Sequence, residues 1–221
     1  MNALHGGVAE REDAKVLKAF VREDVQVQVL PPLPLAPEQA GVYSYLLGMY
    51  LDDGYLCRTP RTYRLEVYLH RDDARVIGSV AAAISSLRPG YRVGFRRHGA
   101  AVVVTSYFKR WPMLFPQHGP GRKNRRDITR APWQRLIVER HPEDFIRGCI
   151  DSDGCRHRRI VCGRNYPAYS FVNHSAPILN LFAEACDLLG LHHRRSNMTT
   201  ISIARRADVA WLDGLMARGT A

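Results

Sequence analysis

The sequence contains one short pattern twice. YLLGMYLDDGYL spans residues 45–56, and FIRGCIDSDGCR spans residues 145–156, one hundred residues further along the chain. In both copies the apolar residues recur at helical spacing, and an Asp-Gly pair follows them. We therefore predict two short helices, each stopped by a glycine, Gly54 or Gly154, in the left-handed conformation that often follows a helix C-terminus.

A second glycine lies inside each predicted helix. Gly48 and Gly148 occupy mid-helix positions, where glycine costs about 1 kcal/mol relative to alanine. Such a cost usually accompanies close packing against another backbone. We predict that the two helices pack against each other through these glycines. Their C-terminal ends would then emerge side by side, carrying Asp53 and Asp153.

This arrangement would concentrate negative charge. Asp53 and Asp153 would meet where two helix dipoles also point their negative ends. The cluster would be unfavourable without a cation, and Mg²⁺ is the usual hard, oxygen-seeking ion. A purely structural role at the helix end explains the two acids less well, because an aspartate there opposes the dipole. We therefore predict a metal site formed by both copies.

The offset of one hundred residues persists beyond the motif and indicates a tandem duplication. The order helix, two strands, helix, two strands, helix is predicted for each half, from apolar-polar alternation and turn signals. The fold class is therefore α+β, with two pseudosymmetric αββαββα halves and two four-stranded antiparallel sheets. The matched pairs are Gly48 and Gly148, Asp53 and Asp153, Gly54 and Gly154, Arg58 and Arg158, Gly90 and Gly190, and Trp111 and Trp211.

The segments LLGMYLDDG and IRGCIDSDG resemble the two motifs of the LAGLIDADG homing endonucleases in their single-chain, two-repeat form. The resemblance covers about residues 42–216. It implies that the motif helices form the interface between the halves, and that the two sheets form a saddle in the DNA major groove. It also implies that the eighth residue of each motif, Asp53 or Asp153, is a catalytic metal ligand, with two or three Mg²⁺ ions bound between them.

The first motif departs from the family pattern at its sixth residue. Leu51 stands where the second copy has Asp151, and the neighbouring Asp52 adds an unusual charge that could perturb the site. The sixth position is not the metal ligand in the family, so the departure leaves catalysis intact in principle. The function implied is a site-specific, Mg²⁺-dependent double-strand DNA endonuclease of the intron or intein type, acting as a monomer.

Composition agrees with a nucleic-acid partner. The 221 residues are 46% hydrophobic and carry a net charge of +11, which favours a globular protein with an anionic partner such as double-stranded DNA. No apolar run approaches the roughly 18 residues of a membrane span, and no signal peptide is evident, so we expect a cytoplasmic protein. The five cysteines are scattered, and we expect neither a disulfide framework nor a structural zinc site.

The basic connecting segment, residues 117–140, contains the candidate active-site base. This is Lys123, one of four lysines against 28 arginines in the chain. A lysine can lose its proton and activate water, so Lys123 is the candidate, with Arg122 and Gln134 behind it; a phosphate-contacting role is equally consistent. We divide the chain into four parts: an N-terminal extension and Pro-rich linker (1–40), the first repeat (41–116), the basic connecting segment (117–140) and the second repeat (141–221).

Arginine can pair with guanine edges, so we expect basic side chains on the sheet faces to contact DNA. Two other functions remain open: a LAGLIDADG-fold DNA-binding transcriptional regulator without cleavage activity, and an RNA-splicing maturase. The regulators resemble this chain less, because they lack the full pair of motif acids. The predicted DNA contacts are Arg58, Arg64, Tyr68, Arg92, Arg96, Arg122, Arg158 and Arg194.

Overall fold

The computed structural model describes residues 31–33 and 35–218. Each half of the chain begins with a helix that contains one motif and passes directly into a strand. The first half comprises α2 (Gln39–Asp53), β1 (Gly54–Arg58), β2 (Tyr63–His70), α3 (Ala74–Leu87), β3 (Gly94–His98), β4 (Ala101–Tyr107) and α4 (Trp111–Leu114). The second comprises α6 (Pro142–Asp153), β5 (Gly154–Val161), β6 (Arg164–Val172), α7 (Ala176–Leu188), β7 (His193–Asn197), β8 (Thr200–Ile203) and α8 (Arg206–Ala217).

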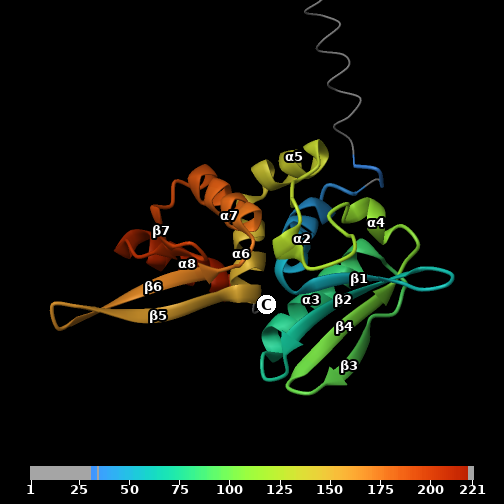
Figure 1. The fold of residues 1–221 in the computed structure, drawn as a ribbon, viewed down its shortest axis with the longest axis horizontal. Helices are drawn as coiled ribbons and strands as arrows, with labels where there is room; N and C mark the ends of the chain where they lie inside the picture. Colours follow the sequence, from blue (N-terminus) through green and yellow to red (C-terminus); the bar gives the residue numbers. More distant parts are fainter. Residues whose placement is uncertain (1–30, 34, 219–221) are drawn as a thin grey trace, which may run out of the picture.

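The two sheets have the same topology. Their strand orders are β1-β2-β4-β3 and β5-β6-β8-β7, and every paired strand is antiparallel. The α+β fold with two pseudosymmetric halves, predicted from the repeat, is therefore confirmed. The helices α2 and α6 lie at the centre of the molecule, and one sheet lies on either side of them (Figure 1).

Each sheet has one face covered by helices. In β2, Leu65, Val67 and Leu69 alternate toward the buried side, as the sequence predicted. In the second sheet, the ring of Phe171 stacks on Phe182 of α7 with their centroids 4.4 Å apart. Within residues 31–33 and 35–218, no helix covers the opposite face of either sheet, and these are the faces predicted to bind DNA.

The central helices meet at their glycines. A β-carbon built on Gly48 would lie 2.6 Å from the carbonyl oxygen of Phe145, and one on Gly148 would collide with the carbonyl oxygen of Tyr45. Only hydrogen at these positions lets the two backbones approach so closely. This contact sets the separation of the two helix ends.

The glycines that follow the helices do not have the predicted conformation. Gly54 has φ −85° and Gly154 φ −86°, both in the extended region. The prediction of left-handed caps is therefore wrong. Glycine is needed for space instead, because a β-carbon on Gly54 would lie 2.5 Å from the Cα of Tyr50, and one on Gly154 would collide with Ile150. In each half the chain thus passes from helix into strand without a loop.

The connecting segment is more regular than its composition suggested. It contains the short 3₁₀ helix η1 (Lys123–Arg125) and the helix α5 (Pro132–Arg140), which begins at a proline as helices often do. Within the described residues, none of the helices has the length and apolarity to cross a membrane.

Candidate active site and nucleic-acid interface

Asp53 and Asp153 are the last residues of α2 and α6. Both lie at helix C-termini, where unpaired carbonyl groups already carry partial negative charge. Ser152 of the second motif donates its hydroxyl hydrogen to Oδ2 of Asp53, over 2.5 Å. The site is thus assembled across the interface between the halves, because a side chain of one motif orients the acid of the other.

Both carboxyl groups have raised pKa values. Burial, together with the nearby charge of Asp153, raises the pKa of Asp53 from 3.8 to about 6, although the hydrogen bond from Ser152 and the charge of Lys123 oppose the shift. Burial also raises the pKa of Asp153, against the charges of Lys123 and His174. Two acids that resist ionisation in the metal-free protein form a site that a divalent cation would stabilise.

Asp52 adds a third carboxyl group. Its Oδ1 accepts a hydrogen bond from the amide nitrogen of Asn173, which lies in the other half. Its Oδ2 is buried, and the described residues offer it no hydrogen-bond partner. Burial first, and then repulsion from Asp153 and Asp53, raises the pKa of Asp52 well above its usual value. The sequence showed the extra charge but not its burial.

Lys123 lies beside these acids, in η1. Its ammonium group donates hydrogen bonds to the carbonyl oxygens of Tyr50 and, over 3.2 Å, Asp52, and so caps the end of α2. The nitrogen also lies 4.7 Å from the centroid of the Tyr50 ring. Burial lowers the pKa of Lys123 to about 8, although Asp52 and Asp53 favour the charged form. The structure therefore brings the lysine predicted from the sequence to the predicted pair of acids.

Gln134 and Arg122, the other two candidates from the connecting segment, do not share the position of Lys123. Gln134 is completely buried, and its amide bonds to Tyr43, Gln117 and two backbone groups. This network joins α5 to α2, and among the described residues Gln134 has no hydrogen bond to Lys123, Asp53 or Asp153. Arg122 is exposed at the start of η1.

Asp151, the sixth residue of the second motif, makes contacts across the interface between the two halves. It forms an ion pair with Arg75 of α3, over 2.5 Å, and accepts a hydrogen bond from the hydroxyl group of Tyr45 over 3.1 Å. Leu51, at the equivalent position of the first motif, is fully buried. The sixth positions of the two motifs therefore differ: Asp151 bonds across the interface between the halves, whereas Leu51 is an apolar core residue.

The open face of the first sheet is basic and aromatic. Strand register places Arg64 and Tyr68 on the face opposite the buried Leu65, and Arg96 of β3 on the same face. Arg92 lies two residues before the start of β3, and its side chain is exposed. Three of the predicted DNA contacts in this half therefore share the face that the helices leave open.

The second sheet has a basic hollow of about 370 Å³ on its open face. Arg194 lies there as predicted, but Arg158 does not, because its pairing with Pro167 places it on the face of Tyr169, toward the helices. By the same register Arg58 lies on the helix side of the first sheet. The hollow is lined by His157, Arg159, His192, His193, Arg194, Ser196, Ser202, Ala204 and Arg205.

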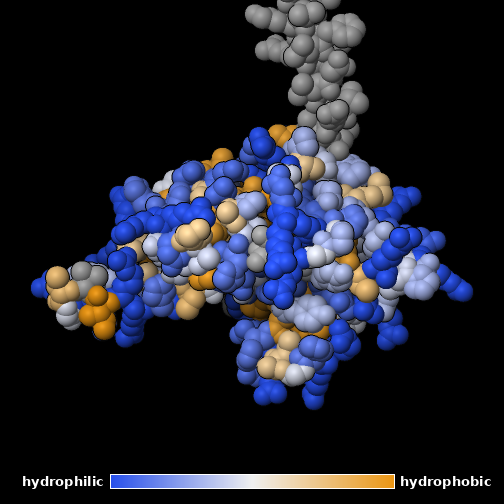
Figure 2. Space-filling view, viewed as in Figure 1, coloured by the Kyte–Doolittle hydropathy of each residue, from blue (hydrophilic) through white to orange (hydrophobic). Residues whose placement is uncertain are grey.

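The sequence could not separate the faces of β5. Four consecutive basic residues form the middle of CRHRRIV, so no apolar alternation marks the buried side, and a shift by one residue exchanges the faces. His157 and Arg159 were therefore missed in favour of Arg158. Figure 2 shows this view of the molecule as largely hydrophilic, with a hydrophobic group at the far end of the β5–β6 hairpin, where Ile160 is 76% exposed.

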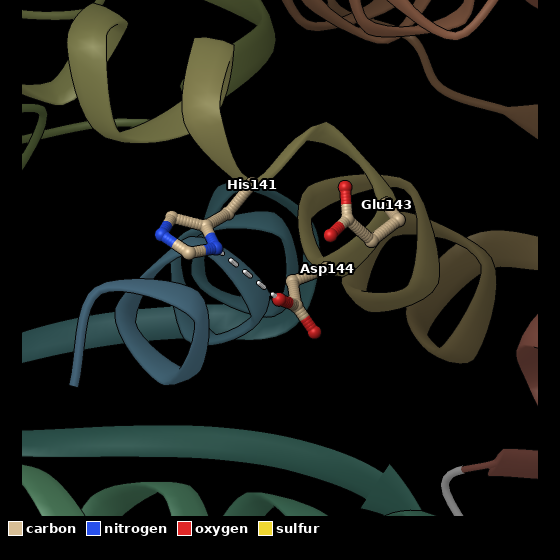
Figure 3. Close-up of side chains that lie close together, drawn as sticks. All are labelled: His141, Glu143 and Asp144. Atoms are coloured by element: carbon tan, nitrogen blue, oxygen red, sulfur yellow. Dashed lines mark ion pairs between the residues drawn. The ribbon is translucent and has the colours of Figure 1, made fainter. Parts of the chain in front are cut away.

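A second cluster of potential metal ligands lies at the opposite end of α6. His141, Glu143 and Asp144 place one ligand atom each within 4.8 Å of one another, and Figure 3 shows them around the first turn of the helix. Acidic residues in a first turn complement the helix dipole. Arg147 already pairs with Asp144 over 3.2 Å. Local electrostatics therefore accounts for the cluster without an ion.

Comparisons with solved structures identify the fold. A structure of mesophilic variants of the homing endonuclease I-DmoI has a TM-score of 0.56 and 13% sequence identity, over 81% of this chain and 97% of the other. I-DmoI in complex with DNA and Ca has a TM-score of 0.53 and 13% identity, over 80% and 90% of the two chains. The fold is that of the LAGLIDADG proteins.

The chain is also similar to a LAGLIDADG domain from another protein. The N-terminal LAGLIDADG domain of DUF199/WhiA has a TM-score of 0.51 and 14% identity, over 86% of this chain and 88% of the other. Other I-DmoI complexes were solved with DNA and Mn, or with target DNA in the presence of Mg. No protein-family model and no curated protein matches the sequence.

Proposed function

We propose that this protein is a site-specific, Mg²⁺-dependent endonuclease that cuts both strands of duplex DNA. One observation carries the proposal: Asp53 and Asp153 end two helices in backbone contact, beside the half-buried Lys123. The basic open faces of the two sheets, to either side of this site, support a DNA substrate. Because one chain supplies both acids, we propose that it acts as a monomer.

Asp53 and Asp153 would hold the divalent cations. Carboxylate oxygens are the ligands that Mg²⁺ prefers, and the burial that raises both pKa values makes a neutralising cation favourable at this site. Bound Mg²⁺ would activate the attacking water and stabilise the leaving 3′ oxygen of each strand. Ser152 fixes the orientation of the Asp53 carboxylate, and so keeps one ligand in place before the cation arrives.

Lys123 contributes a positive charge and a proton that can be exchanged near neutral pH. Its pKa of about 8 leaves a usable fraction of the neutral amine at physiological pH, which arginine could not provide. The amine is held by two backbone carbonyls of α2, so its position is fixed relative to Asp53. We therefore assign it the role of orienting or deprotonating water.

A DNA-binding regulator without cleavage activity is the second candidate. The similarity to the LAGLIDADG domain of WhiA favours it, because the same fold occurs in that protein. The extra buried acid Asp52 is a departure from the motif that could weaken metal binding. The two candidates agree on DNA as partner and differ only in whether the phosphodiester bond is cut.

One experiment separates them. Duplex DNA with a randomised segment is incubated with the protein in Mg²⁺, and any new ends are sequenced; a parallel sample in Ca²⁺ is analysed for bound DNA. The endonuclease predicts cuts at a defined, staggered position within an enriched sequence. Enrichment of a sequence in Ca²⁺ without cuts in Mg²⁺ would support the regulator. Absence of binding at low salt would contradict both.

A further inference from the structure

One acidic residue lies within the basic open face of the first sheet. Glu66 lies in the middle of β2, between Arg64 and Tyr68, and strand register places it on the open face, opposite the buried Leu65 and Val67. Although this face is open, only 5% of its side chain is exposed. A carboxylate on a DNA-facing surface repels phosphates, so its presence needs another explanation.

The carboxylate is surrounded by donors from two strands. Its Oε1 forms an ion pair with the guanidinium group of Arg64, over 2.9 Å, and accepts a hydrogen bond from that of Arg96, over 3.3 Å. Its Oε2 accepts one from the hydroxyl group of Tyr68 over 3.2 Å. Arg64 is held on its other side by Tyr107, whose hydroxyl oxygen lies 3.3 Å from the guanidinium. One acid thus fixes two arginines and a tyrosine.

The two arginines remain accessible despite these bonds. The side chain of Arg64 is 29% exposed and that of Arg96 is 48% exposed, so each can still offer donors to a ligand. Arginine contacts guanine through two parallel hydrogen bonds to N7 and O6, which requires a defined orientation of the guanidinium plane. A guanidinium that is already held in place loses less side-chain freedom when it binds.

We propose that Glu66 is a positioning residue for sequence recognition: it holds Arg64 and Arg96 in orientations that read guanine bases in the major groove. This inference rests on the duplex-DNA binding included in the proposed function, but not on cleavage. Glu66 lowers the general attraction of the first sheet for phosphates and, in exchange, restricts its arginines to contacts with base edges.

The second sheet lacks this arrangement. Tyr166 stands one hundred residues after Glu66 and pairs with Arg159 across β5 and β6. Among the described residues, no carboxylate bonds to Arg159 or Arg194 on the open face. The sharpest preference for guanine should therefore fall in the half of the target that the first sheet covers.

The helix side of the second sheet offers a matched control. Asp213 of α8 bonds to the guanidinium of Arg156 over 2.7 and 2.9 Å and accepts a hydrogen bond from the hydroxyl group of Tyr169 over 2.7 Å. This group has the same chemistry as the Glu66 group, but it lies on the other face. Asp213→Asn and Glu66→Gln make the same change in net charge, so a difference between them reflects position and not charge.

The test is selection of bound duplexes from a randomised library in Ca²⁺, followed by sequencing, for wild type, Glu66→Gln and Asp213→Asn. We expect wild type to enrich guanine at fixed positions in one half of the site. Glu66→Gln should reduce that preference at least tenfold at those positions only, and should steepen the salt dependence of non-specific binding by about one phosphate contact. Asp213→Asn should keep the wild-type preference.

Thermal melting verifies that each variant folds. If Glu66→Gln does not fold, the double variant Arg64→Lys, Arg96→Lys keeps the charge and Glu66, and it should lose the guanine preference. An unchanged preference in folded Glu66→Gln, or in the lysine double variant, would overturn the inference while leaving the proposed function intact. Selective binding without cleavage in Mg²⁺ would overturn the proposed function and leave this inference standing.

Discussion

Gly48 and Gly148 bring the backbones of the two motif helices into contact, so that a β-carbon on Gly148 would collide with the carbonyl oxygen of Tyr45. This contact places the ends of α2 and α6, and with them Asp53 and Asp153, side by side. The geometry of the acids therefore depends on two hydrogen atoms in the middle of the helices, about one and a half turns away.

The first prediction concerns this contact. Gly148→Ala should lower the free energy of unfolding by about 1–3 kcal/mol, because the added methyl group forces the helices apart. Gly214→Ala is the matched control: Gly214 lies in α8, where a β-carbon would meet nothing within 4 Å, so alanine should stabilise the protein by up to about 1 kcal/mol. Chemical denaturation measures both, and equal effects would show that the helices do not meet at Gly148.

The second prediction concerns the buried acid Asp52. Its raised pKa means that the folded protein binds the proton more tightly than the unfolded chain, so this contribution to stability is lost as pH rises above about 4. Asp52→Asn removes the ionisation and keeps an acceptor for Asn173. The metal-free variant should melt at a higher temperature than wild type at pH 8, with a gap that closes toward pH 4. A variant that is less stable at pH 8 would contradict this account.

The third prediction concerns pH and metal together. The pKa of Asp53 is about 6 in the folded protein, so the metal-free protein should lose up to about 3 kcal/mol of stability between pH 4 and pH 6 from this group. Ca²⁺ should restore that stability at pH 7.5, where it replaces the proton, and should have little effect at pH 5. Calorimetric melting of wild type and Asp53→Asn tests this, since the variant should lose the part of each effect that comes from Asp53.

The fourth prediction concerns Lys123. Lys123→Met keeps the apolar stem and removes the amine, so cleavage should fall by about 10²–10⁴-fold while duplex binding in Ca²⁺ persists. Lys123→Arg restores the charge without a titratable amine and should recover only part of the activity. Lys109→Met, at an exposed position, controls for the loss of one positive charge. Full cleavage by Lys123→Met would contradict a catalytic role and leave Lys123 only the structural role of capping the end of α2.

The repeated motif made much of this structure predictable. Gly48 and Gly148 mark the helix contact, Asp53 and Asp153 follow from the helix ends, and clean apolar-polar alternation identifies β2 and its buried face. These features depend on residues close in sequence. They could therefore be inferred without knowing how the distant parts of the chain pack.

Long-range contacts were not predictable in the same way. The position of Arg158 depends on a register that the basic run in the middle of β5 does not encode, and the bond from Asn173 to Asp52 joins residues 121 positions apart. In the sequence, Glu66 is only one polar residue of an alternating strand. Its contact with Arg96 of β3 could not be predicted, because that contact is set by the pairing of the strands. Such features follow from tertiary structure and not from local pattern.

The most direct test of the central claim is cleavage of a mapped target by wild type, Asp53→Asn and Asp153→Asn in Mg²⁺, with binding measured in Ca²⁺. The asparagines keep the size of the side chains but remove the charge that bound cations need. We predict that wild type cuts both strands, and that each variant binds the target but cuts at least a thousandfold more slowly. Cleavage by both variants at the wild-type rate, or tight binding by wild type without any cleavage, would contradict the account.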